Sequence, residues 1–358
     1  MNIAIIGAGN GGQAFAGYLA MQGHQVSLYT RSIEKLGTIA ETNEISLCGL
    51  ISGTGKLYKI CNNISIAINN AEVIFVVTTA NAHEEIAKSM SPFLQDGQTI
   101  VLCPGRTCGA HVFRKTLLGN GCKAQLYLAE AQTLVFACRL ISPGQVNIIG
   151  VKEKVLVAGL PQADTDIIIK KISLLFPCFI AAENTIQTSL ENIGAILHSC
   201  ITLLNAAAID RGEFFYFYRD VTECIANFIE KVDNERLAIG RAYGVRLLSV
   251  REWISFAYPD TKGNSFCELI RNNPGYHDII APSNLFVRQI TEDIPTGIVP
   301  MIELASAVQV ETPALSSIVS LTSILVNVDF RFRGRTLARL GLNGKSWKEI
   351  KTLLANGK

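Results

Sequence analysis

Three glycines near the start of the chain follow the spacing Gly7-x-Gly9-x-x-Gly12, a pattern that can hold a phosphate group. The first glycine allows a tight turn out of a strand, and the second lets the backbone approach a pyrophosphate. The third lets a helix lie close on a sheet. The N–H groups of Asn10 and Gly11, at the positive end of that helix, would then bind the phosphates.

The elements around this loop have the order that such a site needs. Residues 2–6 are an apolar strand pattern, residues 13–22 a helical pattern, and residues 25–29 alternate like a second strand. A glycine loop between a strand and a helix is the context that supports dinucleotide binding. The alternative is a glycine-rich turn with a purely structural role. The βαβ order favours a bound NAD or NADP.

The end of the second strand indicates which dinucleotide is bound. An NAD-binding unit usually carries an acidic residue there for the ribose 2′-hydroxyl, but no carboxylate precedes Glu34 in this segment. The segment instead contains Thr30, Arg31 and Ser32, and a guanidinium suits a 2′-phosphate. We therefore predict NADP as the preferred cofactor and NAD as the alternative. Arg31 could also be a solvated loop cation.

The strand that follows defines the class of sheet. Val73–Val77 is apolar at every position, which is typical of a parallel strand buried on both faces. Residues at its carboxyl end, Thr79 among them, would lie at the edge where doubly wound folds bind ligands. The prediction is an α/β Rossmann domain with a doubly wound, mostly parallel sheet.

The second half of the chain has a different pattern. From about residue 184 long helical segments replace strands, punctuated by glycine and proline. We predict a Rossmann domain over 1–183 and an all-helical substrate and catalytic domain over 184–358. The expected helices include Leu190–Ile209, Val221–Tyr243, Val250–Ala257, Ser283–Glu292, Val299–Val308 and Pro313–Val326.

Composition excludes several classes of function. The 358 residues are 49% hydrophobic with a net charge of +2, which argues against nucleic acid or a membrane surface as a partner. The ten cysteines form no C-x-x-C pair and do not cluster with the five histidines, so no metal site is predicted. Without an export signal, unpaired thiols indicate a cytoplasmic protein.

His198 is the first candidate for acid/base chemistry, because the ordinary pKa of histidine lies near neutrality. It lies in the apolar run Gly194-Ala195-Ile196-Leu197-His198 at the start of the second domain. A histidine in such a run is either a hydrogen-bonded core residue or a placed acid/base. The run alone does not decide between the two.

Several segments together resemble the opine dehydrogenase family, which includes octopine and nopaline dehydrogenases. The resemblance extends over nearly the whole chain and is more specific than the glycine pattern. The similar segments are Gly7–Gly12, Pro104–Thr107, Ala129–Thr133, Cys138–Arg139, Pro143–Val146, Ala195–His198, Glu292–Gly297, Asp329–Arg331 and Gly334–Leu337.

This resemblance implies a reaction and roles for particular residues. Family members condense an amino acid with a 2-oxo acid such as pyruvate, using NADH or NADPH. The catalytic pair of the family falls on His198 and Asp293. The resemblance also implies that Arg288 binds the amino-acid carboxylate and that Glu130 contacts its side chain. Arg106, after a Pro-Gly turn, is a candidate for the oxo-acid carboxylate.

Each of those three residues has a simpler alternative. Arg288 could form a surface salt bridge, and Glu130 and Arg106 could be structural. The chain also departs from the family pattern, with Gly194 where asparagine is frequent and Ser199 where proline is frequent. Gln13 replaces a frequent histidine. These departures leave the identity of the substrate open.

Two other functions remain open at this point. One is a two-domain reductase of 2-oxo or 3-hydroxy acids, which generally relies on a lysine in the helical domain, and no lysine here lies in a comparable uncharged helix. The other is an NAD(P)-sensing protein without turnover, since a fold alone never establishes catalysis. The apolar second half could form a homodimer face.

Overall fold

The structure, a computed structural model, describes residues 1–357. The chain divides into two compact units. The first contains residues 1–105 and 109–182, and the second contains residues 106–108 and the chain from residue 183 onward. The last division lies next to the predicted boundary at 183/184, and residues 106–108 are grouped with the second unit although they lie within 1–183.

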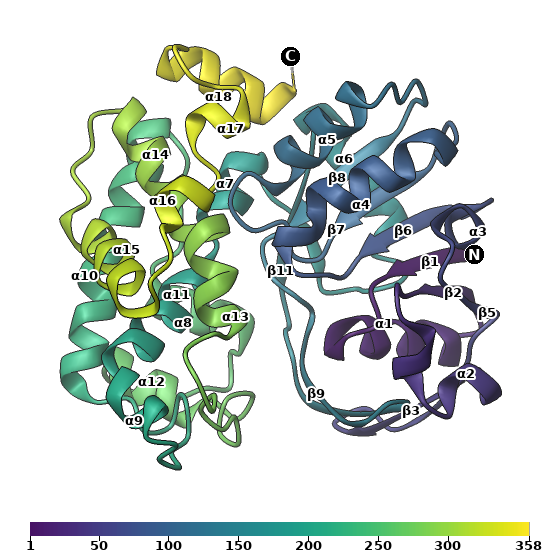
Figure 1. Ribbon diagram of the computed structural model, residues 1–358, viewed down its shortest axis with the longest axis horizontal. Coiled ribbons are helices and arrows are strands. Elements are labelled where there is room, and N and C mark those ends of the chain that lie inside the picture. The colour runs from purple at the N-terminus through teal and green to yellow at the C-terminus, as the bar shows by residue number, and fades with distance from the viewer. Residues whose placement is uncertain (358) are drawn as a thin grey trace. The chain divides into compact units, whose positions relative to one another are not determined.

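The first unit is built on an eight-stranded sheet with the order β12-β11-β8-β7-β6-β1-β2-β5 (Figure 1). Neighbouring strands are parallel except for β11 and β8. The predicted mostly parallel, doubly wound sheet is therefore confirmed. The strands are β1 (Asn2–Ile6), β2 (Gln25–Tyr29), β5 (Lys59–Cys61), β6 (Val73–Val76), β7 (Thr99–Leu102), β8 (Tyr127–Ala131), β11 (Val155–Gly159) and β12 (Phe179–Ala181).

Helices cover both faces of this sheet, as burial of apolar strands on both sides requires. On one face, Phe15 of α1 contacts the rings of Phe75, Phe136 and Phe176. On the other face, a second apolar cluster includes Ile86 and Phe113. The helices of this unit are α1 (Asn10–Met21), α2 (Ile39–Thr42), α3 (Ile64–Ile68), α4 (His83–Met90), α5 (Gly109–Gly119) and α6 (Thr165–Ile172), with short 3-10 turns η1 (Ile33–Leu36), η2 (Ala80–Ala82), η3 (Ser91–Phe93) and η4 (Gln162–Asp164).

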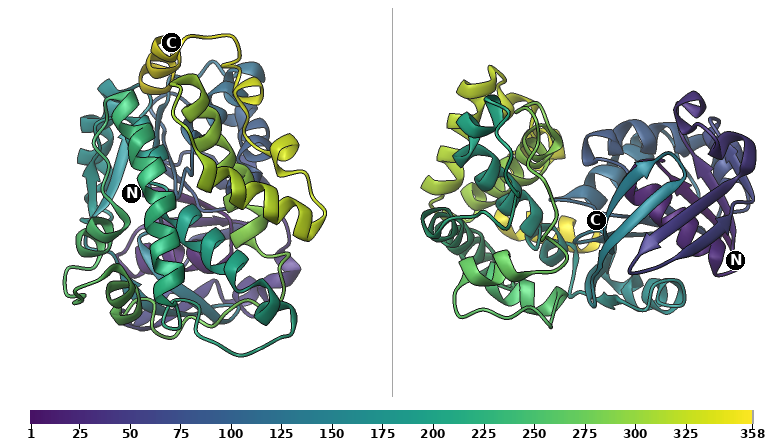
Figure 2. Two further views of the ribbon diagram at one scale, coloured as in Figure 1. Left: turned by 90° about the vertical axis from the view of Figure 1, so that its left-hand side faces the viewer. Right: turned by 90° about the horizontal axis from the view of Figure 1, so that it is seen from below.

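A smaller sheet with the order β4-β3-β10-β9 covers the outer side of α1. Its strands face the viewer in the right-hand view of Figure 2. Two side chains of α1 connect to it, because Asn10 accepts the N–H of Leu140 and Gln13 accepts the N–H of Gly144. The strands are β3 (Glu44–Gly49), β4 (Gly53–Lys56), β9 (Phe136–Ser142) and β10 (Gln145–Val151).

The second unit is helical, as predicted, and α10 packs against α7, α8, α12, α14 and α15. Two of its predicted helices differ from the structure: Leu190–Ile209 is interrupted at Asn192 and Asn205, and of Ser283–Glu292 only the last turn is helical. The helices are α7 (Thr185–Leu190), α8 (Ile193–Leu204), α9 (Ala206–Asp210), α10 (Glu223–Tyr243), α11 (Val250–Ala257), α12 (Phe266–Asn272), α13 (Arg288–Thr291), the π-helical turn η5 (Ile294–Ile298), α14 (Val299–Ala307), α15 (Pro313–Val326), α16 (Phe330–Arg333), α17 (Leu337–Leu340) and α18 (Trp347–Asn356).

A buried charge cluster joins α10 to the segment before α8. Arg236 is fully buried and lies 2.7 Å from the Asp233 carboxylate and 3.7 Å from that of Glu191. Burial raises the pKa of Glu191 to about 7, although the Arg236 charge opposes this rise. Glu191 is therefore a buried carboxyl group that can titrate near neutral pH.

Within residues 1–357 no single helix is long and apolar enough to cross a membrane. The bent pair Pro313–Val326 and Phe330–Leu340 passes the same test by length and composition only.

Candidate active site

His198 lies on α8, a helix whose side chains are mostly buried. Its ring is 12% exposed and lies 6.3 Å from the Phe217 ring and 6.4 Å from the Tyr218 ring. Tyr218 in turn stacks on Tyr276, with 4.2 Å between the centroids. An aromatic wall made of Phe217, Tyr218 and Tyr276 therefore borders the imidazole.

Asp293 meets this imidazole from a segment 95 residues later in the chain. Its Oδ2 lies 2.6 Å from Nδ1 of His198, and its side chain is completely buried. The helix type changes at this point of the chain. Asp293 lies between the single α-helical turn of α13 and the π-helical turn η5. π-helical turns are rare and occur frequently at functional sites.

The electrostatics of the pair suit proton exchange. Burial by itself would raise the pKa of Asp293, but the charge of Arg106 and the bond to His198 hold it at about 2. Burial lowers the pKa of His198 below its ordinary value of 6.5, and the Asp293 carboxylate opposes this shift. The carboxylate is therefore ionised and the imidazole is neutral near pH 7. With Nδ1 facing Asp293, Nε2 remains for another partner.

Arg106 reaches the same place from a loop between β7 and α5. Its guanidinium is 7% exposed and lies 3.2 Å from Asp293 and 3.4 Å from Glu292. Nη1 donates to the side-chain oxygen of Asn192 at 3.2 Å. The backbone of Arg106 has a φ of +60°, a left-handed conformation that is uncommon outside glycine.

The two residues after Arg106 fix this loop to the helical unit. The N–H of Thr107 donates to the carbonyl of Thr296, and its hydroxyl donates to the carbonyl of Ser189. The N–H of Cys108 donates to the Ser189 hydroxyl, and Arg335 donates to the carbonyl of Thr107. Residues 106–108 are therefore built into the second unit.

Arg288 is the more accessible of the two predicted substrate arginines. Its side chain is 44% exposed, and its Nη1 lies 3.5 Å from Glu292. The charge of Arg288 also contributes to lowering the pKa of Asp293. Glu292 pairs with Arg106 through one oxygen and with Arg288 through the other.

Glu130 accepts a hydrogen bond from the backbone at the start of α5, within the first unit. Its side chain is completely buried, and Oε2 accepts the N–H of Ala110 at 2.7 Å, in the first turn of α5. A carboxylate at the positive end of a helix is stabilised by the helix dipole. Gly105 lies so close that a Cβ at this position would be 2.5 Å from the Cβ of Glu130.

The glycine loop of the first unit fits a pyrophosphate. A Cβ on Gly12 would lie 1.8 Å from the carbonyl oxygen of Gly7, whereas one on Gly9 would meet nothing within 4 Å. The start of α1 has no side-chain cap, so its first N–H groups are available to a ligand. Thr78, next to the predicted Thr79, packs its methyl group against Gly7.

The residues predicted to select the cofactor lie together at the end of β2. Thr30 forms a local turn with Ser32. Arg31 lies 3.1 Å from the carboxylate of Glu85, and both side chains are more than 60% exposed. An ion pair exposed to this degree is weak, so a phosphate could displace Glu85.

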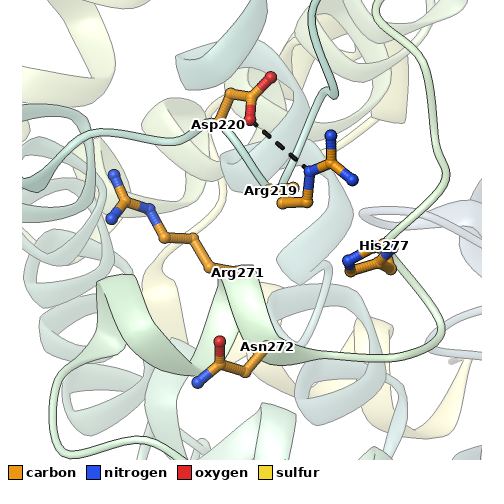
Figure 3. Close-up of a pocket in the computed structure, with 5 residues that line it drawn as sticks. All are labelled: Arg219, Asp220, Arg271, Asn272 and His277. Atoms are coloured by element: carbon orange, nitrogen blue, oxygen red, sulfur yellow. Dashed lines mark ion pairs between the residues drawn. The ribbon is translucent and has the colours of Figure 1, made fainter.

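A separate hollow in the helical unit is lined by Arg219, Asp220, Arg271, Asn272 and His277. Figure 3 shows these side chains around the opening and the ion pair between Arg219 and Asp220. It contains none of the residues assigned above to catalysis, substrate binding or cofactor binding. Among residues 1–357 no group of three or more His, Cys, Asp or Glu side chains could hold a metal ion.

Comparison with known proteins identifies the family. Residues 181–326 match the alpha-helical domain of NAD/NADP octopine/nopaline dehydrogenases. Residues 2–105 match the N-terminus of NAD-dependent glycerol-3-phosphate dehydrogenase. An opine dehydrogenase from Arthrobacter sp. (strain 1C) is 37% identical over 343 residues, which cover 95% of each chain. The chain belongs to the opine dehydrogenase family.

Solved structures agree with this membership at the level of the fold. Octopine dehydrogenase with NADH and L-arginine has a TM-score of 0.81 at 20% identity, covering 100% of this chain and 98% of that one. Yersinopine dehydrogenase with bound NADP+ has a TM-score of 0.72 at 12% identity, covering 99% and 98%. The family resemblance seen in the sequence is confirmed, and the protein is an NAD(P)-dependent oxidoreductase that acts on CH–NH donors.

The structure brings together some of the predicted site residues of this opine dehydrogenase. His198, Asp293, Arg106 and Arg288 lie in one network of the helical unit. The other predicted residues, Glu130 and the cofactor group, belong to the first unit. Sequence reasoning missed the bridging role of Glu292. The only available signal was its position directly before Asp293.

Proposed function

We propose that His198 is the acid/base of the reductive condensation and that Asp293 orients it. The observation that carries the proposal is the buried 2.6 Å contact between Nδ1 of His198 and the Asp293 carboxylate. A carboxylate on one ring nitrogen fixes the tautomer and stabilises the imidazolium that forms when the other nitrogen takes a proton. The lowered pKa of His198 favours the neutral ring that begins this cycle.

The proton steps follow from this geometry. The amine of the amino acid attacks the carbonyl carbon of the 2-oxo acid, and His198 passes the proton that the attacking nitrogen loses to the carbonyl oxygen, which gives the neutral carbinolamine. His198 then takes a second proton from solvent and donates it to the hydroxyl group, which leaves as water and gives the protonated imine. When bound, the reduced nicotinamide supplies the hydride that converts the imine carbon to the product.

Arg288 is the proposed anchor of the amino-acid carboxylate. It is half-exposed and only 3.5 Å from Glu292 on one nitrogen, so its remaining donors can form bidentate hydrogen bonds with a carboxylate. Glu130 is a weaker candidate for the amino-acid side chain, because its Oε2 already accepts the N–H of Ala110.

NADP is the proposed preferred cofactor. The support is Arg31 at the end of β2, where NAD-binding units usually carry an acidic residue. Replacing Arg31 with alanine should raise the KM for NADPH roughly 10- to 100-fold, as expected for loss of a charge-assisted bidentate contact. The KM for NADH should change little, and Lys88→Ala on α4 serves as the surface control. Equal effects on both cofactors would refute the preference.

The substrates are tested by a matrix assay. NADPH and NADH oxidation is followed with twenty amino acids, each combined with pyruvate, glyoxylate or 2-oxoglutarate, and with every component alone. The proposal expects oxidation only when both an amine and an oxo acid are present, and a product whose mass equals their sum minus water plus two hydrogens. Full-rate oxidation with an oxo acid alone would indicate a 2-oxo acid reductase instead. Cofactor binding without oxidation in any mixture would indicate a nucleotide sensor.

A homodimer and a cytoplasmic location remain predictions. Light scattering of the purified protein checks the first, and fractionation of cells that express it checks the second. Ten cysteines without a disulfide are consistent with a reducing compartment.

A further inference from the structure

The guanidinium of Arg106 has a protein partner on each of its three nitrogens. Nε faces Glu292 at 3.4 Å, Nη1 donates to Asn192 at 3.2 Å, and Nη2 lies 3.2 Å from Asp293. The side chain is only 7% exposed. A guanidinium that grips a substrate carboxylate presents two donors to an open space. Here each nitrogen already contacts a protein group and the side chain is almost fully buried, which favours a role other than substrate binding.

Arg106 supplies a positive charge beside the buried carboxylate of Asp293. One carboxylate oxygen contacts His198, whereas the other is buried and accepts no hydrogen bond from the described residues. The Nη2 of Arg106 is the cation that lies against this second oxygen. A buried carboxylate oxygen without compensation is costly, and the charge of Arg106 contributes more than the charge of His198 or Arg288 to lowering the pKa of Asp293 and keeping its carboxylate ionised.

Gly194 provides the space for this arrangement. It lies one helical turn before His198 on α8, and a Cβ there would lie 2.9 Å from Nη1 of Arg106 and 3.4 Å from Cε1 of His198. Its backbone has an ordinary helical conformation that any residue can adopt. Glycine is less favourable than alanine inside a helix, so the absence of a side chain here serves the packing of the guanidinium beside the imidazole.

We propose that Arg106 is a positioning residue that fixes the Asp293 carboxylate, and through it the His198 ring, with Gly194 as the gap that admits its guanidinium. This inference rests on the proposed acid/base role of His198. Arg106 thereby acts on the rate of proton transfer and not on the affinity for the oxo acid.

The test compares Arg106→Gln and Arg106→Lys with wild type, and Arg251→Gln, a half-exposed arginine paired with Glu230, is the matched control. For Arg106→Gln we expect kcat to fall roughly 10- to 100-fold, the range that a small misplacement of a catalytic group produces. The KM values for both substrates should stay within about threefold, because no binding contact is lost. Arg106→Lys should recover part of kcat, since it restores the charge but not the three-way geometry.

A pH profile separates positioning from mere support of the fold. The charged groups that act on His198 are Asp293, Arg288 and Arg106. Loss of the Arg106 charge should favour the imidazolium, so the acid limb of kcat/KM for opine oxidation should move to higher pH in Arg106→Gln. A KM for the oxo acid that rises tenfold or more with an unchanged kcat and pH profile would overturn the proposal and return Arg106 to substrate binding.

Two further variants keep the test decisive. Gly194→Ala retains every charge and improves helix propensity, so it tests whether the space beside Gly194 is needed even if Arg106→Gln fails to fold. We expect a lower kcat with an unchanged thermal unfolding temperature. Unchanged kinetics in this variant would overturn the role of Gly194.

The second variant combines Arg106→Gln with His198→Ala. In the His198→Ala background, Arg106→Gln should add little further loss of kcat, and a full additional loss would contradict action through His198. Wild-type activity of His198→Ala itself would refute the proposed function instead.

Discussion

The imidazole of His198 has one nitrogen on a buried carboxylate, and Nε2 has no hydrogen-bond partner among residues 1–357. While Nδ1 is bonded to Asp293, the ring can accept and donate a proton only at Nε2. The contact requires two residues 95 positions apart, so it depends on the tertiary structure of the helical unit.

Replacing His198 with alanine should lower kcat by roughly two to four orders of magnitude, the usual contribution of general acid/base catalysis. The affinity for NADPH should be unchanged, because the predicted cofactor residues lie in the other unit. Steady-state kinetics and a fluorescence titration with NADPH measure the two quantities. His277→Ala is the control, since His277 is half-exposed and pairs with Asp278. A His198→Ala enzyme with more than half of wild-type kcat would remove His198 from the mechanism.

The pH dependence of opine oxidation is a second residue-level prediction. In this direction His198 must accept a proton, so kcat/KM falls as pH decreases through its pKa. Since burial lowers that pKa below 6.5, the acid limb should lie below pH 6.5. Asp293→Asn removes the negative charge that favours the imidazolium, so its acid limb should lie lower still, with a smaller maximal rate. A limb at or above that of wild type would contradict the assigned electrostatics.

The sequence led to His198 and Asp293 through the family resemblance, and the structure places them in contact. It could not show that each nitrogen of Arg106 contacts a protein group, because those partners are Asn192, directly before α8, and two residues of the segment after α13. The chemistry of a guanidinium is the same in a substrate site and in a buried network. Only the tertiary contacts distinguish the two.

At the scale of elements, helices with strong local signals were predicted well. Val250–Ala257 agrees with α11, which begins with a capping box between Ser249 and Glu252, and Pro313 marks the start of α15. The predicted helix Ser283–Glu292 was wrong over its first half. There Asn284 accepts the N–H of Phe286, a local turn that competes with helix formation. Phe286 itself is 67% exposed.

The charge cluster that joins α10 to the segment before α8 predicts a pH-dependent stability. The pKa of Glu191 is raised from 4.5 to about 7 in the folded protein, so folding binds a proton between these values. This contribution is fully present below pH 4.5 and is lost as pH rises through about 7. We expect the free energy of unfolding to fall by on the order of 1–3 kcal/mol between pH 5 and 8.5 from this residue.

Glu191→Gln is the variant that tests this cluster. The amide cannot ionise, so the decrease in stability over this pH range should become smaller than in wild type. Urea unfolding at several pH values measures the difference, and Glu311→Gln at an exposed position of the helical unit controls for a general loss of acidic groups. An identical pH dependence in wild type and Glu191→Gln would show that Glu191 is not the titrating group.

At the scale of the whole molecule, the cofactor residues and the proposed acid/base pair belong to different units. Excess NADPH without other substrates should therefore slow hydrogen exchange mainly around Gly7–Gly12 and Thr30–Ser32, since bound ligand suppresses local opening where it makes contacts. Peptides that contain His198 should exchange as before. Protection confined to the chain from residue 183 onward would contradict the assignment of the glycine loop.

The two-unit organisation followed from a change in sequence pattern near residue 184, where strands give way to helices. The departure of residues 106–108 from the first unit had no such signal, because three residues are too few to show a periodic pattern. Their membership depends on bonds to Ser189, Thr296 and Arg335, which only the folded chain brings together.

That three-residue insertion limits how the protein can be divided. A fragment cut at residue 183 would carry His198, Asp293 and Glu292 but would lack Arg106, so two buried carboxylates would lose their shared counter-ion. A chimaera that exchanges the helical half between relatives therefore also has to graft the tripeptide Arg106–Cys108, which lies far upstream in the gene. The chain from residue 183 onward alone is therefore not a complete unit of exchange.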